Sequence, residues 1–166
     1  MPGQRIVVMG VSGSGKSTIG ALLAARLGLP FVEGDALHPP RNVALMAAGT
    51  ALTDDDRREW LDAVAHELAH AESGVVASCS ALKRDYRDRL RRAAPDLRFV
   101  YLHGDAPLLA QRLQERVGHY MPPSLLQSQL DTLEPPQPDE RVLACDVARA
   151  PEAIVLDCQQ ALEAPP

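Results

Sequence analysis

Residues 5–18 read RIVVMGVSGSGKST, which is a short apolar run followed by a glycine-rich loop and the start of a helical pattern. The apolar run predicts a buried strand, and the loop from Gly10 to Ser17 fits the spacing GxxxxGK[ST]. Glycines let successive backbone N–H groups turn inward onto an anion, and the following helix adds the positive end of its dipole. Strand, loop and helix in this order predict a nucleotide-binding unit.

The glycine-rich loop supplies the predicted contacts to a nucleotide. Lys16 is expected to reach the β- and γ-phosphates, and the Ser17 hydroxyl is expected to ligate Mg²⁺. A turn that binds no ligand is the alternative, and the complete motif between a strand and a helix argues against it. The motif indicates ATP or GTP without identifying the group that receives the phosphoryl. The predicted nucleotide-binding residues of the loop are Gly10, Val11, Ser12, Gly13, Ser14, Gly15, Lys16, Ser17 and Thr18.

Short apolar runs alternate with helical patterns along the rest of the chain. Strands are predicted at 6–9, 31–33, 75–79, 98–102 and 142–145. Helices are predicted at 18–27, 42–48, 54–72, 82–94, 106–116, 124–133 and 151–162. This alternation predicts an α/β fold, with a parallel sheet covered by helices on both faces, in a single domain over residues 1–166. Such sheets bind ligands beyond the carboxyl ends of their strands, so functional residues should follow strands.

Composition restricts the class of protein. The chain has 166 residues, 46% of them hydrophobic, and its net charge of −5 argues against a broad basic surface for nucleic acid. Cys79, Cys145 and Cys158 are dispersed without CxxC spacing, which is typical of reduced thiols. The apolar runs are shorter than a signal peptide or a membrane span requires. We therefore expect a cytoplasmic protein that binds neither membranes nor nucleic acid.

Residues 33–42 read EGDALHPPRN and follow the second predicted strand. The stretch is too rich in helix breakers to be predicted as a helix and too charged to be core. Asp35 lies at the carboxyl edge of the sheet, where a kinase places an acid near the hydroxyl that attacks the γ-phosphate. The alternative is a turn aspartate that caps the next element. One domain leaves little room for a motor protein, and no NKxD guanine-reading motif follows a strand, so a small kinase is favoured.

Several motifs together resemble the gluconate kinases of the shikimate-kinase-like P-loop group. They are GVSGSGKST at 10–18, GDALHPPRN at 34–42, LTDDDRREWL at 52–61, CSALKRDYRDRLR at 79–91, FVYLHGD at 99–105 and RVGHYMPPSLLQSQLDTLEPP at 116–136. GDALHP and CSALKxxYRD are far more specific than the phosphate loop. The resemblance covers roughly residues 6–162.

The resemblance implies ATP-dependent phosphorylation of D-gluconate at its 6-hydroxyl to give 6-phosphogluconate, with ATP and Mg²⁺. It implies the P-loop NTPase fold with a parallel sheet in the order 2-3-1-4-5, a substrate-binding region at about 38–72 and a lid at about 116–126. The family also suggests a homodimer. A related P-loop kinase acting on another small polyol or hydroxy acid, such as shikimate, is the alternative. A nucleotide-dependent regulatory module without turnover is a second one.

Residues after the second strand are the first candidates for binding the acceptor. Asp35 is expected to orient the reacting hydroxyl and accept its proton, to hold Mg²⁺, or both. His38 and Arg41 lie in the same loop and are expected to face the acceptor or a phosphate. By resemblance to the shikimate kinases, Arg57 matches an arginine that grips the substrate carboxylate. A solvated arginine in the charged run DDDRRE is the alternative.

The segment after the third strand offers further cations. Lys83 and Arg87 are four residues apart, so they share a helix face and could both point into the acceptor cleft. Which of the cations grips the carboxylate stays open. No acid follows the third strand, where many P-loop proteins place one, so Ser17 and Asp35 are the predicted metal ligands.

The lid and the adenine end are assigned by resemblance. In related kinases an arginine that stacks on adenine precedes a lid residue by seven positions, and Arg112 and His119 match this spacing. The relatives have arginine at the lid position, which leaves open whether Arg116 or His119 contacts the transferred phosphoryl. We assign Arg116 to the nucleotide and His119 to the acceptor. Gln129 is predicted to bind an acceptor hydroxyl, and Pro151 to lie at the other face of the adenine.

Overall fold

A parallel β-sheet forms the centre of the molecule, for which a computed structural model describes residues 3–115 and 123–164. The strands follow the order β2-β3-β1-β4-β5, which confirms the order that the resemblance implied. They are β1 (Arg5–Met9), β2 (Phe31–Glu33), β3 (Val75–Ser78), β4 (Arg98–His103) and β5 (Leu143–Asp146). The five strands predicted from the apolar runs are therefore present, with ends that differ by at most one residue.

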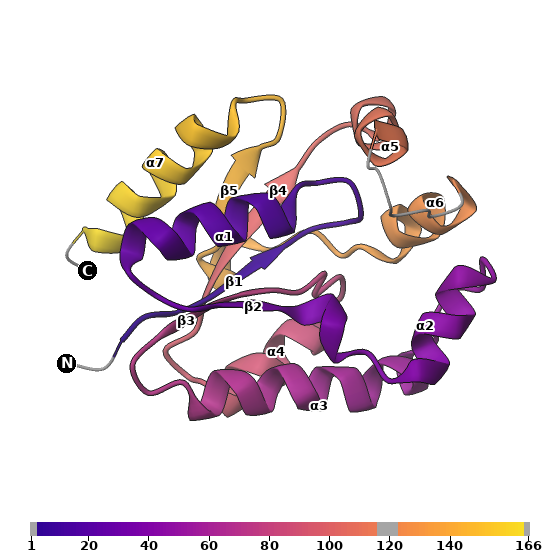
Figure 1. Ribbon diagram of the computed structural model, residues 1–166, viewed down its shortest axis with the longest axis horizontal. Helices are drawn as coiled ribbons and strands as arrows, with labels where there is room; N and C mark the ends of the chain where they lie inside the picture. The colour runs from indigo at the N-terminus through magenta and orange to yellow at the C-terminus, as the bar shows by residue number, and fades with distance from the viewer. Residues whose placement is uncertain (1–2, 116–122, 165–166) are drawn as a thin grey trace.

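Helices cover both faces of the sheet (Figure 1). On one face, α1 (Lys16–Leu27) packs against α7 (Pro151–Glu163), and on the other α3 (Asp54–His70) packs against α4 (Arg84–Ala93). Three shorter helices lie toward the carboxyl ends of the strands (Figure 1), namely α2 (Pro40–Ala47), α5 (Ala106–Glu115) and α6 (Pro123–Thr132). The predicted ligand-binding edge of the sheet therefore has helical segments around it.

Strand β1 forms the middle of the core. Residues 6–9 are fully buried, because β3 and β4 pair with the strand on its two sides while helices cover both faces. Val7 aligns with Ala77 of β3 and with Phe99 of β4. A strand buried on both faces needs a continuous apolar run, not an alternating one, and this explains the sequence IVVM. The phosphate loop that follows it is consequently attached to the central, fully buried strand of the sheet.

Helix α3 begins at a capping box. The Thr53 side chain accepts a hydrogen bond from the Asp56 N–H, and the Asp56 carboxylate accepts one from the Thr53 N–H. Three consecutive acids, Asp54, Asp55 and Asp56, lie in the first turn, where the helix dipole stabilises negative charge. The cap determines where α3 starts and therefore which of its residues face the sheet edge.

The prediction that residues 33–42 contain no helix is wrong. Gly34–Leu37 form a 3₁₀ turn, η1, and α2 begins at Pro40. Proline is compatible with the first turn of a helix because the N–H it lacks has no intrahelical partner there. The two short helices hold Asp35 and His38 in a defined backbone, where the sequence suggested only a stiff loop.

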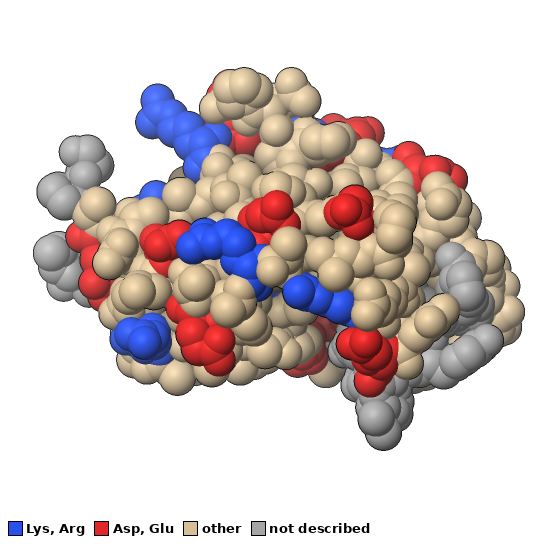
Figure 2. Space-filling model, turned by 90° about the horizontal axis from the view of Figure 1, so that it is seen from above, with Lys and Arg blue, Asp and Glu red and all other residues tan. Residues whose placement is uncertain are grey.

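The surface mixes charges of both signs. On the upper face of Figure 1, blue and red side chains are interspersed (Figure 2). Across the described part of the chain, the helices are too short or too polar for any of them to span a membrane.

Candidate active site

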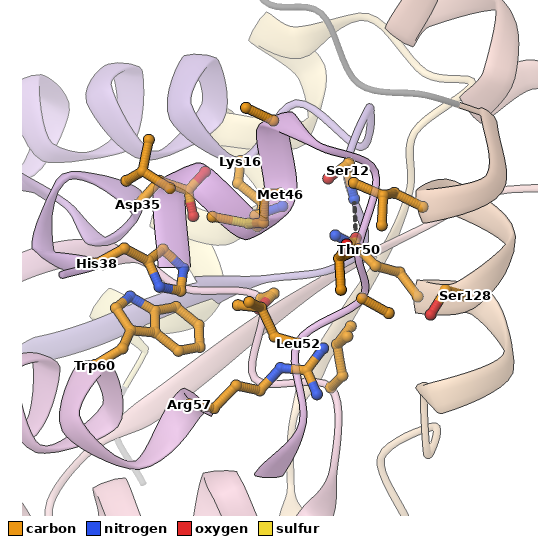
Figure 3. Close-up of a pocket in the computed structure, with 17 residues that line it drawn as sticks. Ser12, Lys16, Asp35, His38, Met46, Thr50, Leu52, Arg57, Trp60 and Ser128 are labelled. Carbon is orange, nitrogen blue, oxygen red and sulfur yellow. Dashed lines mark hydrogen bonds between the residues drawn. The ribbon is translucent and has the colours of Figure 1, made fainter. Parts of the chain in front are cut away.

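Two adjoining cavities lie at the edge of the sheet where the strands end. The first, of about 430 Å³, is bounded by the phosphate loop, α5 and the start of α7. The second, of about 370 Å³, is bounded by the phosphate loop, η1, α2, α3 and α6. Ser12, Lys16 and Asp35 line both cavities, and Figure 3 shows them around the second one. A group that passes from a ligand in one cavity to a ligand in the other must move past Lys16 and Asp35.

The phosphate loop has a backbone that requires glycine. Gly13 and Gly15 have φ angles of +86° and +90°. A Cβ atom on Gly13 would also lie 2.7 Å from the carbonyl oxygen of Leu109, so a larger residue is excluded for two reasons. Helix α1 begins directly after Gly15, which directs its first N–H groups at the loop.

Seven of the nine loop residues predicted to contact the nucleotide line the first cavity, and two do not. Residues 12–18 line the first cavity, whereas Gly10 and Val11 do not. The Gly10 N–H donates to the Ser80 carbonyl oxygen at 3.3 Å, which joins the loop to the segment after β3. Val11 contributes its carbonyl oxygen to the Lys16 ammonium at 3.1 Å. The backbone groups of these two residues therefore stabilise the loop through hydrogen bonds within the protein.

Glu33, at the end of β2, lies beside the phosphate loop. Its Oε2 accepts a hydrogen bond from Ser17 Oγ at 2.5 Å, and its Oε1 accepts one from Ser78 Oγ at 2.5 Å. Sequence reasoning named Asp35 as the metal-binding acid and did not assign Glu33. A signal was available, because Glu33 precedes Asp35 by two residues at the same sheet edge.

The oxygens near Ser17 fit the chemistry of Mg²⁺. A hydroxyl and a carboxylate are hard ligands, and Mg²⁺ is usually held by one or two such groups together with water and substrate phosphates. Within residues 3–115 and 123–164 no cluster of three or more acidic, histidine or cysteine side chains could hold a metal by itself. Ser17 and Glu33, with Asp35 at the junction of the cavities, could therefore hold Mg²⁺ together with nucleotide phosphates.

His38 lines the second cavity and is held on two sides. Its ring stacks on the Trp60 ring, with centroids 4.3 Å apart and planes 14° from parallel (Figure 3). Trp60 is itself anchored by a 2.8 Å hydrogen bond from its Nε1 to the Gly34 carbonyl oxygen. Burial lowers the pKa of His38 to about 4, with Asp35 raising it and Arg57 lowering it. The imidazole is therefore neutral near pH 7.

Arg57 brings a buried positive charge to the second cavity. The residue is only 8% exposed, and its guanidinium donates to the Tyr86 hydroxyl at 3.1 Å. Tyr86 in turn donates to Asp54, and burial together with this hydrogen bond raises the pKa of Tyr86 to about 12. Among the described residues no carboxylate lies within ion-pair distance of Arg57. Asp54 and Asp56 interact with Arg57 only over a longer distance, so a direct ion pair with Arg57 is left for a ligand.

Three other predicted acceptor-binding cations lie outside the cavity. Arg41 is exposed and forms a 3.3 Å ion pair with Asp56, and Lys83 forms a 3.1 Å ion pair with Asp54. The prediction that Lys83 and Arg87 both point into the cleft is wrong. Arg87 is completely buried, and its Nε donates to Glu140 at 2.7 Å. In each case the cation forms an ion pair with an acidic residue of another element. For Lys83 and Arg87 that acid is also distant in the sequence.

Three of the remaining predicted site residues line one or the other cavity. Arg112 and Pro151 line the first cavity, together with Arg149, which lies in the same predicted adenine-binding segment as Pro151. Gln129 lines the second cavity, and its Oε1 accepts a 2.8 Å hydrogen bond from the Ser12 N–H. Arg116 and His119 lie outside the described residues.

Comparison with known proteins agrees with this geometry. A family model described as an AAA domain matches residues 6–136. The gluconokinase of Gluconobacter oxydans (strain 621H) is 50% identical over 154 residues, which cover 90% of this chain and 86% of that protein. The chain belongs to the gluconokinase family. The crystal structure of a gluconokinase from Sinorhizobium meliloti 1021 is 56% identical with a TM-score of 0.89, covering 97% of this chain and 91% of that one.

Other gluconokinases are similar over most of the chain, and more distant kinases share its fold. The thermosensitive gluconokinase of Escherichia coli (strain K12) is 41% identical over 167 residues, covering 98% of this chain and 89% of that protein. The shikimate kinase of Bacteroides thetaiotaomicron is only 20% identical with a TM-score of 0.72, covering 97% of this chain and 99% of that one. The second likeness shows a shared fold and says nothing of the acceptor.

Proposed function

We propose that this protein transfers the γ-phosphoryl group of ATP to the 6-hydroxyl of D-gluconate and releases 6-phosphogluconate. The observation that carries the proposal is the pair of cavities that share Lys16 and Asp35, with the buried Arg57 in the acceptor cavity. Family membership supports the same acceptor, because the relatives are described as gluconokinases. A shikimate acceptor has only the fold in its favour.

The nucleotide side follows from the first cavity. Residues 12–18 are positioned to surround the phosphates of ATP, and Arg112 and Pro151 lie at the end where the adenine would rest. Lys16 neutralises charge on the β- and γ-phosphates. Ser17, Glu33 and Asp35 are the residues that would hold Mg²⁺, which would neutralise negative charge on the phosphates during transfer.

The acceptor side follows from the second cavity. Arg57 grips the gluconate carboxylate, because a guanidinium forms strong paired hydrogen bonds with a carboxylate. His38 and Gln129 are placed to bind hydroxyls along the chain of the acceptor. The 6-hydroxyl at the far end then lies beside Asp35, between the cavities.

Transfer forms one bond to the γ-phosphorus, breaks another bond to it and moves one proton. Asp35 orients the 6-hydroxyl and accepts its proton while the hydroxyl oxygen bonds to the γ-phosphorus. The bond between that phosphorus and the bridging oxygen of ADP breaks, and the electron pair stays with ADP. Closure of the proposed lid, at about 116–126, would keep water from competing as the acceptor.

We also infer from family membership that the enzyme works as a cytoplasmic homodimer. Residues 38–72 form its proposed substrate-binding region, since His38, α2, the segment after α2 and the first turns of α3 supply most of the wall of the second cavity. The whole chain, residues 1–166, then acts as a single kinase domain.

Incubation with ATP, Mg²⁺ and a panel of acceptors tests the proposed reaction. We expect ADP release to depend on gluconate and to be weak with shikimate, glycerate and nucleosides, since their carboxylates or hydroxyls do not match both Arg57 and Asp35. Mass spectrometry of the product identifies the phosphorylated position. A preference for shikimate or glycerate would assign another acceptor, and tight ATP binding without any product would indicate a regulatory module.

Replacement of Arg57 by leucine tests the carboxylate grip. We expect KM for gluconate to rise by about tenfold to a hundredfold, because a charged hydrogen bond to the carboxylate is lost. The KM for ATP should change far less, because Arg57 does not line the first cavity. Arg58→Leu is the matched control, since Arg58 is the next residue of α3 but is exposed and paired with Asp55. Equal effects of the two substitutions on gluconate KM would contradict the assignment.

A further inference from the structure

Asn42 is a completely buried polar residue whose side chain connects two elements of the acceptor site. It belongs to α2, and its amide nitrogen donates to the Asp56 carbonyl oxygen in α3 at 2.7 Å. The same nitrogen lies 3.2 Å from Nδ1 of His38, which precedes α2. Asn42 does not line the acceptor cavity and cannot touch a ligand there. Among its two hydrogen-bond partners, His38 is the one whose side chain lines that cavity.

The backbone carbonyl of Asp56 determines which way the Asn42 amide points. A carbonyl oxygen only accepts hydrogen bonds, so the amide nitrogen must face it. The rotated amide would bring its oxygen against the Asp56 oxygen and lose that bond. In the observed orientation the Asn42 Oδ1 is buried without a hydrogen-bond partner among the described residues. The Asn42 nitrogen therefore keeps its bonds to Asp56 and His38, while the Asn42 Oδ1 has no hydrogen-bond donor among the described residues.

The amide orientation in turn decides the protonation of His38. Because the Asn42 nitrogen donates, Nδ1 of the neutral ring must accept, and the ring proton must sit on Nε2. Stacking on Trp60 and the hydrogen bond from the His38 N–H to the Asp35 carbonyl oxygen hold the ring plane and its backbone. Nδ1 is occupied by Asn42, so the Nε2–H edge is the edge left for a ligand in the cavity that His38 lines.

We propose that Asn42 is a positioning residue that holds His38 in its Nε2–H tautomer, so that His38 presents a single hydrogen-bond donor to an oxygen of the acceptor. The inference deepens the proposed function, on which its catalytic part rests. It makes His38 a selector of acceptors that place a hydroxyl or carboxylate oxygen at this point. It also leaves Asp35 as the group that takes the proton, since the His38 lone pair is already used by Asn42.

The tautomer can be observed directly in the free enzyme. Nitrogen-15 NMR of the histidine side chains at neutral pH should show His38 with a pyridine-like Nδ1 and a protonated Nε2, and loss of the signals in His38→Gln assigns them. A protonated Nδ1, a charged ring or a mixture of both tautomers would overturn the proposal. This measurement needs no acceptor, so its outcome is independent of whether gluconate is the substrate.

A double-mutant cycle separates positioning from a merely structural role. Glutamine at position 38 carries an amide N–H near the place of Nε2–H and has no ring tautomer for Asn42 to select. We expect Asn42→Ala to lower kcat/KM by about tenfold in the wild-type background, and by less than about threefold in the His38→Gln background. The loss in the wild-type background should appear mainly in KM for the acceptor, because the hydrogen bond forms with the bound acceptor.

Equal losses in the two backgrounds would show that Asn42 only connects α2 to α3, and would overturn the proposal. Thermal unfolding of all four proteins shows whether Asn42→Ala destabilises both backgrounds alike, which either interpretation allows. The kinetic cycle uses whichever acceptor the panel identifies. If the panel finds no turnover, the proposed function fails while the NMR result still stands or falls alone.

Discussion

Replacing Asp35 with asparagine should lower kcat by about a hundredfold or more, the usual contribution of a positioned acid or base. Asparagine has nearly the same size and still lines both cavities, but it cannot accept the proton of the attacking hydroxyl. ATP affinity should change little, because residues 12–18 of the phosphate loop make most of the first cavity. Steady-state kinetics with gluconate, together with calorimetric titration of an ATP analogue, measure the two quantities separately.

Asp55→Asn is the matched control for this substitution. Asp55 is an exposed acid in the first turn of α3 whose partner is Arg58, so its replacement should leave kcat near the wild-type value. If Asp35→Asn retains more than a tenth of the wild-type kcat, Asp35 has a structural role as a turn residue and another group takes the proton.

Replacing Arg87 with leucine should destabilise the fold by about 3–5 kcal/mol, because the substitution leaves the buried Glu140 charge without its main partner. Five hydrogen bonds use every donor of the Arg87 guanidinium. Two go to Glu140, and the others go to the carbonyl oxygens of Ala81, Leu82 and Glu134. Arg87 thus ties the segment after β3, which forms part of the acceptor cavity, to the segment after α6.

Denaturant unfolding measures this loss, and Arg84→Leu is its matched control. Arg84 lies one turn earlier in α4 and pairs with Asp139 at the surface, where such a bond contributes at most about 1 kcal/mol. Similar losses for the two arginines would contradict the structural role of Arg87. Burial alone would raise the pKa of Glu140, but hydrogen bonds from Arg87, from the Gln137 N–H and from Arg91 outweigh it and lower that pKa to about 2.

The lowered pKa of Glu140 has a consequence for acid stability. A carboxyl whose folded pKa lies below its unfolded value stabilises the fold above the unfolded value, and this contribution is lost as the pH falls toward the folded value. For Glu140 that window runs from 4.5 down to about 2. The difference in unfolding free energy between the wild type and Glu140→Gln, measured by denaturant unfolding, should therefore become smaller as the pH falls through this window.

Much of the nucleotide site could be predicted because its signals are local. The glycine positions, Lys16 and Ser17 lie within one short loop, and the required φ angles at Gly13 and Gly15 are properties of that loop alone. The fold class followed from short apolar runs that alternate along the chain with helical patterns. Each run is continuously apolar because a strand of a parallel sheet is buried on both faces. Asp35 was found because its distance from the end of β2 places it at the ligand-binding edge of any parallel sheet.

The basic residues show where prediction from sequence stops. Arg41, Lys83 and Arg87 carry the same positive charge as Arg57. Helix spacing made Lys83 and Arg87 equal candidates for binding the acceptor. Their roles depend on which acid comes near in space. Glu140 lies 53 residues from Arg87, and Asp54 lies 29 residues from Lys83. Only Arg57 reaches the cavity without an acidic partner among the described residues.

The sequence by itself determined the phosphate loop, the parallel sheet, the acidic residue at its edge and, through whole motifs, the family. These properties are set by residues close together in the chain and by the periodicity of burial. Only the tertiary structure decided that Glu33 contacts Ser17, that Arg57 lies buried at the acceptor cavity and that Asn42 contacts His38. Hydrogen bonds and ion pairs form between atoms a few ångströms apart, and folding brings such atoms together from different elements.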